Sequence, residues 1–284
     1  MTLGKLGSSC RFPDIEVLVI SGRGQRAALN ALSVVANQAY EGWVHTLLIC
    51  DDWAWTGDMP IETERRSFRR VSIVNHDQAK NQTTMERVAR LRNVGLSLSS
   101  GSLLCFLDDD NDWSHNHLSS LSNVIQSKDV DTAYCWRRIL DEDGREWDGT
   151  TFPWGYEPDR KREIFDRLEV AGVVTKGSNV FRDTLFFDDG GQRVGLVDMG
   201  SWLFRRHVFD SIRFEDTYTD WEIIDLISED DKLSQAILDR GFSTSCSEQP
   251  TLTYRLGGFS NGRDESLQDG SSGTKARQPK SFAD

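Results

Sequence analysis

The sequence is poor in cysteine: its five cysteines are scattered, and no two of them form a CxxC pair. An odd number of cysteines without metal-ligand spacing argues against both a disulfide framework and a zinc site. The chain also lacks an apolar run long enough to cross a membrane, and its first residues lack the apolar centre of a signal peptide. We therefore expect a cytoplasmic protein with buried thiols, and peripheral attachment to a membrane stays open.

Basic residues are also in deficit. The 33 lysines and arginines face 45 acidic residues, which gives a formal net charge of -12. Nucleic acid and anionic membrane surfaces would repel such a chain, so we expect no nucleic-acid partner, and a bound phosphate needs a local cation. The 284 residues, 38% hydrophobic and 27% charged, are ordinary for a globular α/β enzyme built around one sheet.

Short β-branched runs alternate with helical patterns in the first half of the chain. The expected strands are 15–20, 43–50, 71–74 and 102–107, and the expected helices span about 28–39 and 84–98. Strand, helix and strand within about 35 residues form the βαβ unit of a parallel sheet. The second and fourth strands both end in aspartates, and the carboxyl ends of parallel strands share the edge where open α/β sheets bind ligands.

The second half gives a weaker pattern. We expect a helix near 118–125, strands at 130–140 and 200–204, and a helix at 230–240 that ends at Gly241. Residues 141–193 mix aromatic, charged and glycine residues, which favours loops, short edge strands and a surface facing an acceptor. The segment beyond about 256 is rich in glycine, serine and charge, so we expect it to be flexible.

The acidic turn after the fourth strand is the most informative segment. Residues 108–112 (DDDND) place four carboxylates in five positions directly after an apolar strand. Like charges at this spacing repel and raise one another's pKa, whereas a divalent cation that prefers oxygen turns the cluster into a binding site. A solvated acidic turn is the alternative, and the position after a buried strand favours a site.

Two further groups at the same edge each have two interpretations. Asp51 and Asp52 either cap a turn or accept the imide N–H of a uracil, which requires no metal. Arg90 and Arg92 lie before Gly95 on a helix that points at this edge. A basic group there either pairs with a diphosphate or forms a surface ion pair.

A last acidic group, Glu229 to Asp231, opens the helix near 230–240. Carboxylates in a first helical turn are favoured by the helix dipole, so capping explains them. One of them could instead act as the general base that removes the proton of an acceptor hydroxyl. Asp220 is a second choice for that role.

Taken in order, these segments resemble the family 2 glycosyltransferases of GT-A fold over roughly residues 15–256. The loop 20–24 matches the position of a donor-contacting loop. Residues 89–96 (ARLRNVGL) are similar to an aRNxGl stretch, and 101–110 (GSLLCFLDDD) to the run that holds the DxD motif. Residues 200–206 (GSWLFRR) are similar to a strand ending in FRR that lines the acceptor side, and Glu229-Asp230 to the ED motif.

The resemblance implies an α/β fold of GT-A type, with a mixed, mainly parallel sheet flanked by helices. It implies an Mn²⁺ or Mg²⁺ ion and a role for each of these groups: donor binding by Ser21, Gly22, Arg23, Asp52, Arg92, Asp108 and Asp109; metal binding by Asp110 and Asp108; catalysis by Asp230 with Glu229; acceptor binding by Trp202, Gly200 and Asp231.

The activity implied is inverting transfer of a sugar from a UDP- or GDP-sugar to a hydroxyl acceptor, which could be a glycan, a lipid-linked sugar or a small molecule. A nucleotidyltransferase that makes nucleotide sugars and a catalytically silent carbohydrate-binding protein are the alternatives. The domain is expected at 14–256, with a nucleotide-sugar half (14–113) and an acceptor half (114–256). An N-terminal extension (1–13) precedes it and a tail (257–284) follows it, and residues 255–263 could form a lid.

Overall fold

The computed structural model describes residues 12–57, 70–76, 82–185, 187–189, 192–224 and 227–257. Most of the expected N-terminal extension, tail and lid lies outside these residues. The described elements are β1 (Ile15–Ser21), α1 (Gln25–Ala36), β2 (Val44–Asp51), β3 (Arg70–His76), α2 (Thr84–Leu98), β4 (Leu103–Asp108), β5 (Asp112–Trp113), α3 (His117–Lys128), β6 (Thr132–Leu140), α4 (Pro158–Val170), β7 (Val180–Phe181), β8 (Phe187–Asp189), β9 (Gln192–Val194), η1 (Met199–Ser201), β10 (Trp202–Arg205), α5 (Val208–Ser211), α6 (Asp220–Ile224), α7 (Glu229–Arg240) and β11 (Thr244–Arg255).

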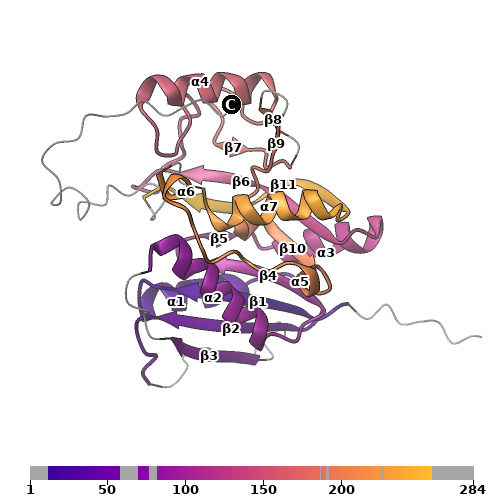
Figure 1. The fold of residues 1–284 in the computed structure, drawn as a ribbon. Coiled ribbons are helices and arrows are strands. Elements are labelled where there is room, and N and C mark those ends of the chain that lie inside the picture. Colours follow the sequence, from indigo (N-terminus) through magenta and orange to yellow (C-terminus); the bar gives the residue numbers. More distant parts are fainter. Residues whose placement is uncertain are drawn as a thin grey trace, which may run out of the picture.

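Within the described residues, the strands form a nine-stranded sheet in the order β3-β2-β1-β4-β10-β6-β11-β5, with β7 beside β6 and a separate β8–β9 pair. The long pairs are parallel: β1 with β2 and β4, β2 with β3, and β6 with β11. The pairs made by β10, β5 and β7 are antiparallel and shorter. Helices flank this sheet (Figure 1), so the expected α/β fold with a mixed, mainly parallel sheet is confirmed.

Alternation along the strands divides the core between two faces of the sheet. Val17 and Val19 of β1 pack in one cluster with α1 and α3, whereas Leu18 and Ile20 pack in a second cluster with α2, α5 and α7. Burying each such side chain contributes about 1.5–3 kcal/mol. At Gly95 a Cβ atom would lie 3.1 Å from the Ile49 side chain, so glycine lets α2 pack close to the sheet.

The helices that carry the candidate basic and catalytic residues have clear sequence signals at their ends. Helix α2 begins with a capping box between Thr83 and Glu86, and its predicted span is confirmed. Helix α7 begins with a capping box between Ser228 and Asp231 and ends at Gly241 in the left-handed region, as predicted. No described helix combines the length and the apolar character that crossing a membrane requires.

The second half departs from the sequence prediction in three places. Residues 141–193, predicted as loops and short strands, contain the helix α4. It buries only Phe165 and Leu168 and is otherwise largely charged, which weakens its periodic signal. Residues 199–201 form a 3-10 turn, so the strand predicted at 200–204 begins only at Trp202. The long strand β11 was not predicted.

Candidate active site

The ends of β1, β2 and β4 meet at one edge of the sheet, as predicted from the acids that follow β2 and β4. In the parallel register Ile20 pairs with Asp108, and Ser21 pairs with Cys50. The Ser21 hydroxyl donates a 2.7 Å hydrogen bond to Asp109 Oδ2, and the Arg23 backbone N–H donates to the same oxygen at 3.1 Å. The loop after β1 is therefore fastened to the acidic turn after β4.

Asp110 faces a cavity beside this loop. The cavity, of about 560 Å³, is lined by α1, by the acidic turn and by Arg23 and Arg255. Burial, followed by the nearby Asp108 and Asp109 carboxylates, raises the pKa of Asp110 to about 6. The Arg23 guanidinium is 3.4 Å from Asp110 but is largely exposed, so it compensates only part of this charge.

Arg92 joins the acidic turn to the start of α7. Its guanidinium donates to Asp108 at 3.2 Å and to Glu229, 137 positions away, at 2.9 and 3.1 Å. Burial alone would lower the pKa of Arg92, but Asp108 and Glu229 raise it above its ordinary value. In this structure the Arg92 side chain is only 2% exposed, and its contact with a donor diphosphate stays a prediction. What the structure shows is that Arg92 holds two acidic segments together.

The three acids at the start of α7 have different surroundings. Glu229 is buried against Arg92, and burial raises its pKa. Asp231 accepts hydrogen bonds from the Ser228 backbone and hydroxyl, so it serves as the helix cap rather than as a free acceptor ligand. Asp230 is half-buried and has no hydrogen-bond partner among the described residues, yet its charge acts on Arg92 and Asp198. Among the three, Asp230 is the carboxylate available for chemistry.

Asn93 and Tyr218 lie close to Arg92 and to the acids that open α7, and neither was among the predicted site residues. The Asn93 side chain pairs with both backbone groups of Phe214, at 2.7 and 3.0 Å, and so fixes the segment that leads to Tyr218. The buried Tyr218 hydroxyl has no hydrogen-bond partner in the described part of the chain. Its pKa is raised, first by burial and then by Glu229 and Asp230. The sequence did show Asn93 next to Arg92. It could not show the distant residues, Phe214 and Glu229, that these two side chains bond.

The end of β2 contributes one buried and one exposed acid. Asp51 is buried and is 3.0 Å from Arg87, so its role is structural. Asp52 is exposed and has a positive φ of 60° at the same sheet edge. Trp53 donates its indole N–H to the Ser21 carbonyl at 2.7 Å, which couples this turn to the loop after β1. Asp52 thus stays a candidate for contacting a donor base.

Trp202, predicted to contact the acceptor, lies in the core. Its side chain has no exposed surface, and its ring packs against Phe204 and Tyr134 in the core. A bound sugar needs an exposed ring face, which Trp202 does not offer. Gly200 is also buried, although its backbone carbonyl accepts a bond from Trp113 beside the acidic turn.

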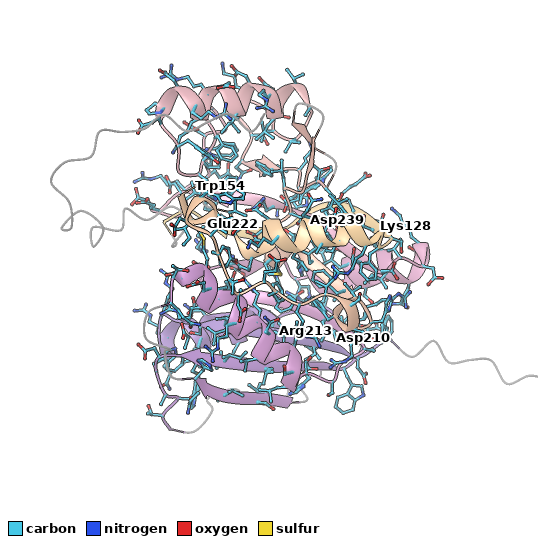
Figure 2. The ribbon with its side chains drawn as sticks, viewed as in Figure 1. Lys128, Trp154, Asp210, Arg213, Glu222 and Asp239 are labelled. Carbon is cyan, nitrogen blue, oxygen red and sulfur yellow. The ribbon has the colours of Figure 1, made fainter. Side chains whose placement is uncertain are left out.

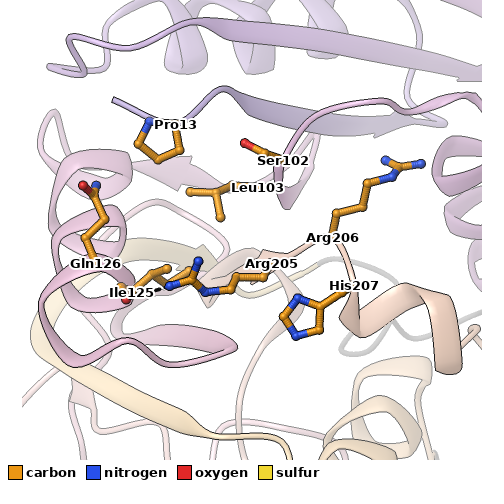
Figure 3. Close-up of a pocket in the computed structure, with 8 residues that line it drawn as sticks. All are labelled: Pro13, Ser102, Leu103, Ile125, Gln126, Arg205, Arg206 and His207. Atoms are coloured by element: carbon orange, nitrogen blue, oxygen red, sulfur yellow. Dashed lines mark hydrogen bonds between the residues drawn. The ribbon is translucent and has the colours of Figure 1, made fainter. Parts of the chain in front are cut away.

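The arginines of the FRR stretch lie at the opposite edge of the sheet, which corrects their placement on the acceptor side. Arg205, Arg206 and His207 line a second cavity of about 500 Å³ with Pro13 and Leu103, as Figure 3 shows. Leu103 begins β4 and Asp108 ends it, so the two edges are about 17 Å apart at 3.3 Å per residue. Strand β10 runs antiparallel to β4, which carries its last residues away from the acids.

The acidic turn has the donor chemistry for a hard divalent cation. Asp110 supplies a carboxylate whose pKa is raised by burial and by the neighbouring acids, and the buried Asn111 Oδ1 beside the cavity lacks a hydrogen-bond partner among the described residues. The described residues contain no group of three His, Cys, Asp or Glu side chains arranged to hold a metal. A magnesium-like ion would therefore need further ligands from substrate phosphates and water, as is common for Mg²⁺.

Comparisons with known proteins show what this chain is similar to. The chain is 24% identical over 120 residues to an Escherichia coli protein, UDP-Glc:alpha-D-GlcNAc-diphosphoundecaprenol beta-1,3-glucosyltransferase WfgD. The match covers 42% of this chain and 44% of that protein, so the chain spans less than half of the length of this curated relative.

Among solved structures, Staphylococcus aureus TarS 1–349 gives a TM-score of 0.49 at 14% identity, over 85% of this chain and 60% of that one. Its complex with UDP also gives 0.49, at 13% identity over 86% of this chain and 60% of that one. Residues 80–188 match the family described as glycosyl transferase family 2. The matched region contains Arg92 and the acidic turn.

Proposed function

We propose that the chain transfers a sugar from a nucleoside-diphosphate sugar to a hydroxyl acceptor, with inversion at the anomeric carbon. The observation that carries this proposal is the Arg92 bridge: one buried guanidinium bonds Asp108 in the acidic turn and Glu229 beside Asp230. It brings an acid group suited to a metal–diphosphate and a candidate base to one edge of the sheet.

Asp230 is the group that takes the proton of the acceptor hydroxyl. It lies in the first turn of α7 and has no hydrogen-bond partner among the described residues, so its carboxylate can accept that proton. Glu229, engaged with Arg92, fixes the start of the helix. Asp220 is the weaker candidate, because it begins the separate short helix α6 at an exposed position.

The loop after β1 and the acidic turn hold the donor. Ser21 and the Arg23 backbone position Asp109, while Asp110 and Asn111 present oxygens to the cavity. A bound Mn²⁺ or Mg²⁺ ion would neutralise charge on the leaving nucleoside diphosphate. Asp52 would accept the imide N–H of a uracil base. UDP-glucose is the first donor to test, because the E. coli relative is named for it.

A product assay tests the proposal. The chain is incubated with UDP-glucose, UDP-GlcNAc or GDP-mannose, Mn²⁺ and a panel of sugar acceptors, and nucleoside diphosphate and product are quantified. We expect release of nucleoside diphosphate with formation of the glycoside of inverted configuration. Pyrophosphate release from a sugar phosphate and a nucleoside triphosphate, or donor binding without turnover of any donor, contradicts the proposal.

A further inference from the structure

Arg137 lies outside every predicted group but is the centre of a second buried ion cluster. The β6 side chain is 7% exposed and donates to Asp183 at 2.8 Å, to Asp198 at 3.2 Å and to the Leu196 carbonyl at 3.2 Å. It thereby fixes three points of the segment that leads into η1.

Three aromatic rings enclose the Arg137 guanidinium. Trp154 and Phe181 have their ring centroids 4.8 Å from it, and Tyr254 of β11 is 5.7 Å away. In the view of Figure 2, Trp154 lies between α4 and the sheet. Contacts from β7, β11 and the loop before α4 therefore hold the guanidinium in place. Its three hydrogen bonds are donated from a fixed position.

From Arg137 the bonds continue to the acidic turn. Asp183 accepts bonds from the Asp198 backbone at 3.1 Å and from the Ser201 hydroxyl at 3.0 Å. Asp198 accepts from the Gly200 backbone at 2.9 Å, and the Gly200 carbonyl accepts from the Trp113 indole at 3.0 Å. Trp113 follows the acids of residues 108–112 directly. A continuous set of bonds thus links Arg137, the η1 turn and the strand β5.

The same cluster acts on the candidate base. The Asp198 carboxylate is buried, and the charges of Asp230 and Asp108 both act on it. Of the groups around Asp198, Arg137 is the cation and Asp183, Asp230 and Asp108 are the acids. If Arg137 shifted, Asp198 and the turn would move relative to both.

We propose that Arg137 is a positioning residue that holds the η1 turn at a fixed distance from the acidic turn and from Asp230. This inference rests on the proposed function for its kinetic effect and on the hydrogen-bond network alone for its structural effect. The two parts can be tested separately, because the second requires no turnover.

The test compares Arg137→Lys with Arg182→Lys in the full chain. Lysine keeps a cation between the buried carboxylates but lacks the planar fork that bonds three acceptors. Arg182 is a matched control: it also stacks on an aromatic ring, Trp136, but bonds Gly172 and Thr175 rather than the η1 turn. Hydrolysis of UDP-glucose with Mn²⁺ gives kcat and donor KM, and hydrogen exchange follows peptides that cover 196–204 and 108–113.

For Arg137→Lys we expect a kcat at least tenfold lower with donor KM within twofold of wild type, and faster exchange in both peptides. Arg182→Lys should leave all four quantities unchanged. The proposal is overturned if Arg137→Lys exchanges like wild type in both peptides, or if it raises donor KM and leaves kcat intact. If wild type does not turn over a nucleotide sugar, the proposed function fails, and the exchange measurement alone then decides the role of Arg137.

Discussion

The two edges of the sheet carry cavities of similar size, about 560 and 500 Å³, but differ in how their charged side chains are paired. At the amino edge, where β4 begins, each of the basic side chains has a bonding partner. Arg205 bonds the Val130 carbonyl and Asp129, Arg206 bonds Ser99, and His207 pairs with Asp131. At the carboxyl edge, where β4 ends, three aspartates follow one another, and burial, followed by the charges of Asp108 and Asp109, raises the pKa of Asp110. A crowded, partly buried group of carboxylates, and not cavity size, distinguishes the candidate site.

The difference follows from how each edge is built. The amino edge is assembled from residues that neutralise one another, so an added ligand would have to displace existing bonds. The carboxyl edge holds a carboxylate, Asp230, and an amide oxygen of Asn111 without hydrogen-bond partners in the described residues. Buried polar groups without hydrogen-bond partners destabilise the fold. Their presence here indicates that a ligand supplies the missing partners.

The largest expected effect is a loss of transfer activity when the carboxyl edge is changed. Asp230→Asn removes the proposed base, so transfer should fall about 10²- to 10⁴-fold while the chain stays folded. The measurement is release of nucleoside diphosphate at saturating donor, with circular dichroism as the check on folding. Asp220→Asn is the control and should keep wild-type activity. Equal activity of Asp230→Asn and wild type would remove Asp230 from the mechanism.

A second pair of variants compares how much one arginine at each edge contributes to the free energy of unfolding. Arg92→Met leaves the Asp108 and Glu229 carboxylates without their shared cation, so unfolding in urea should lose about 3–5 kcal/mol. Arg206→Met, at the other edge, breaks bonds to Ser99 and should cost only about 1 kcal/mol. Similar losses in the two variants would show that the Arg92 bridge stabilises the fold no more than the Arg206 bonds do.

The third prediction concerns pH. Because the folded-state pKa of Asp110 is about 6 and its ordinary value is 3.8, the folded chain binds a proton more tightly than the unfolded chain between these values. The Asp110 contribution to stability therefore falls as pH rises from about 4 to about 6, by up to about 3 kcal/mol. Without divalent ions, Asp110→Asn should be more stable than wild type at pH 7, and the difference should shrink towards pH 4.

The same variant tests the cation. Mn²⁺ with UDP should raise the melting temperature of wild type, since a ligand of the folded state stabilises it. The increase should be lost in Asp110→Asn. If Mn²⁺ with UDP raises the melting temperature of both proteins equally, the ion binds elsewhere or not at all. The acidic turn then has a different role.

The smallest expected effect is at the amino edge. His207→Ala removes a half-exposed pair with Asp131, which should cost less than about 1 kcal/mol. It should leave donor KM within twofold of wild type, because this edge is about 17 Å from the acids by strand length. A large change in KM would place a functional site in this second cavity and reverse the comparison.

Prediction from the sequence succeeded where the signal is local. The span of α2, the end of α7 at Gly241 and the acids after β2 and β4 follow from periodicity, capping residues and strand ends. It did not foresee that Trp202 and Arg92, whose residue types suit a binding site, are buried. It missed α4, because few of its residues face the core.

The sequence by itself determined the α/β order of the elements and the edge at which the acids collect, because strand direction and side-chain alternation are local properties of the chain. Only the tertiary structure decided which charges are paired. Arg92 meets Glu229 from 137 positions away, and Arg137 meets Asp183 and Asp198 across separate segments. Such pairing depends on burial and on distances between distant residues, and these arise only when the chain packs.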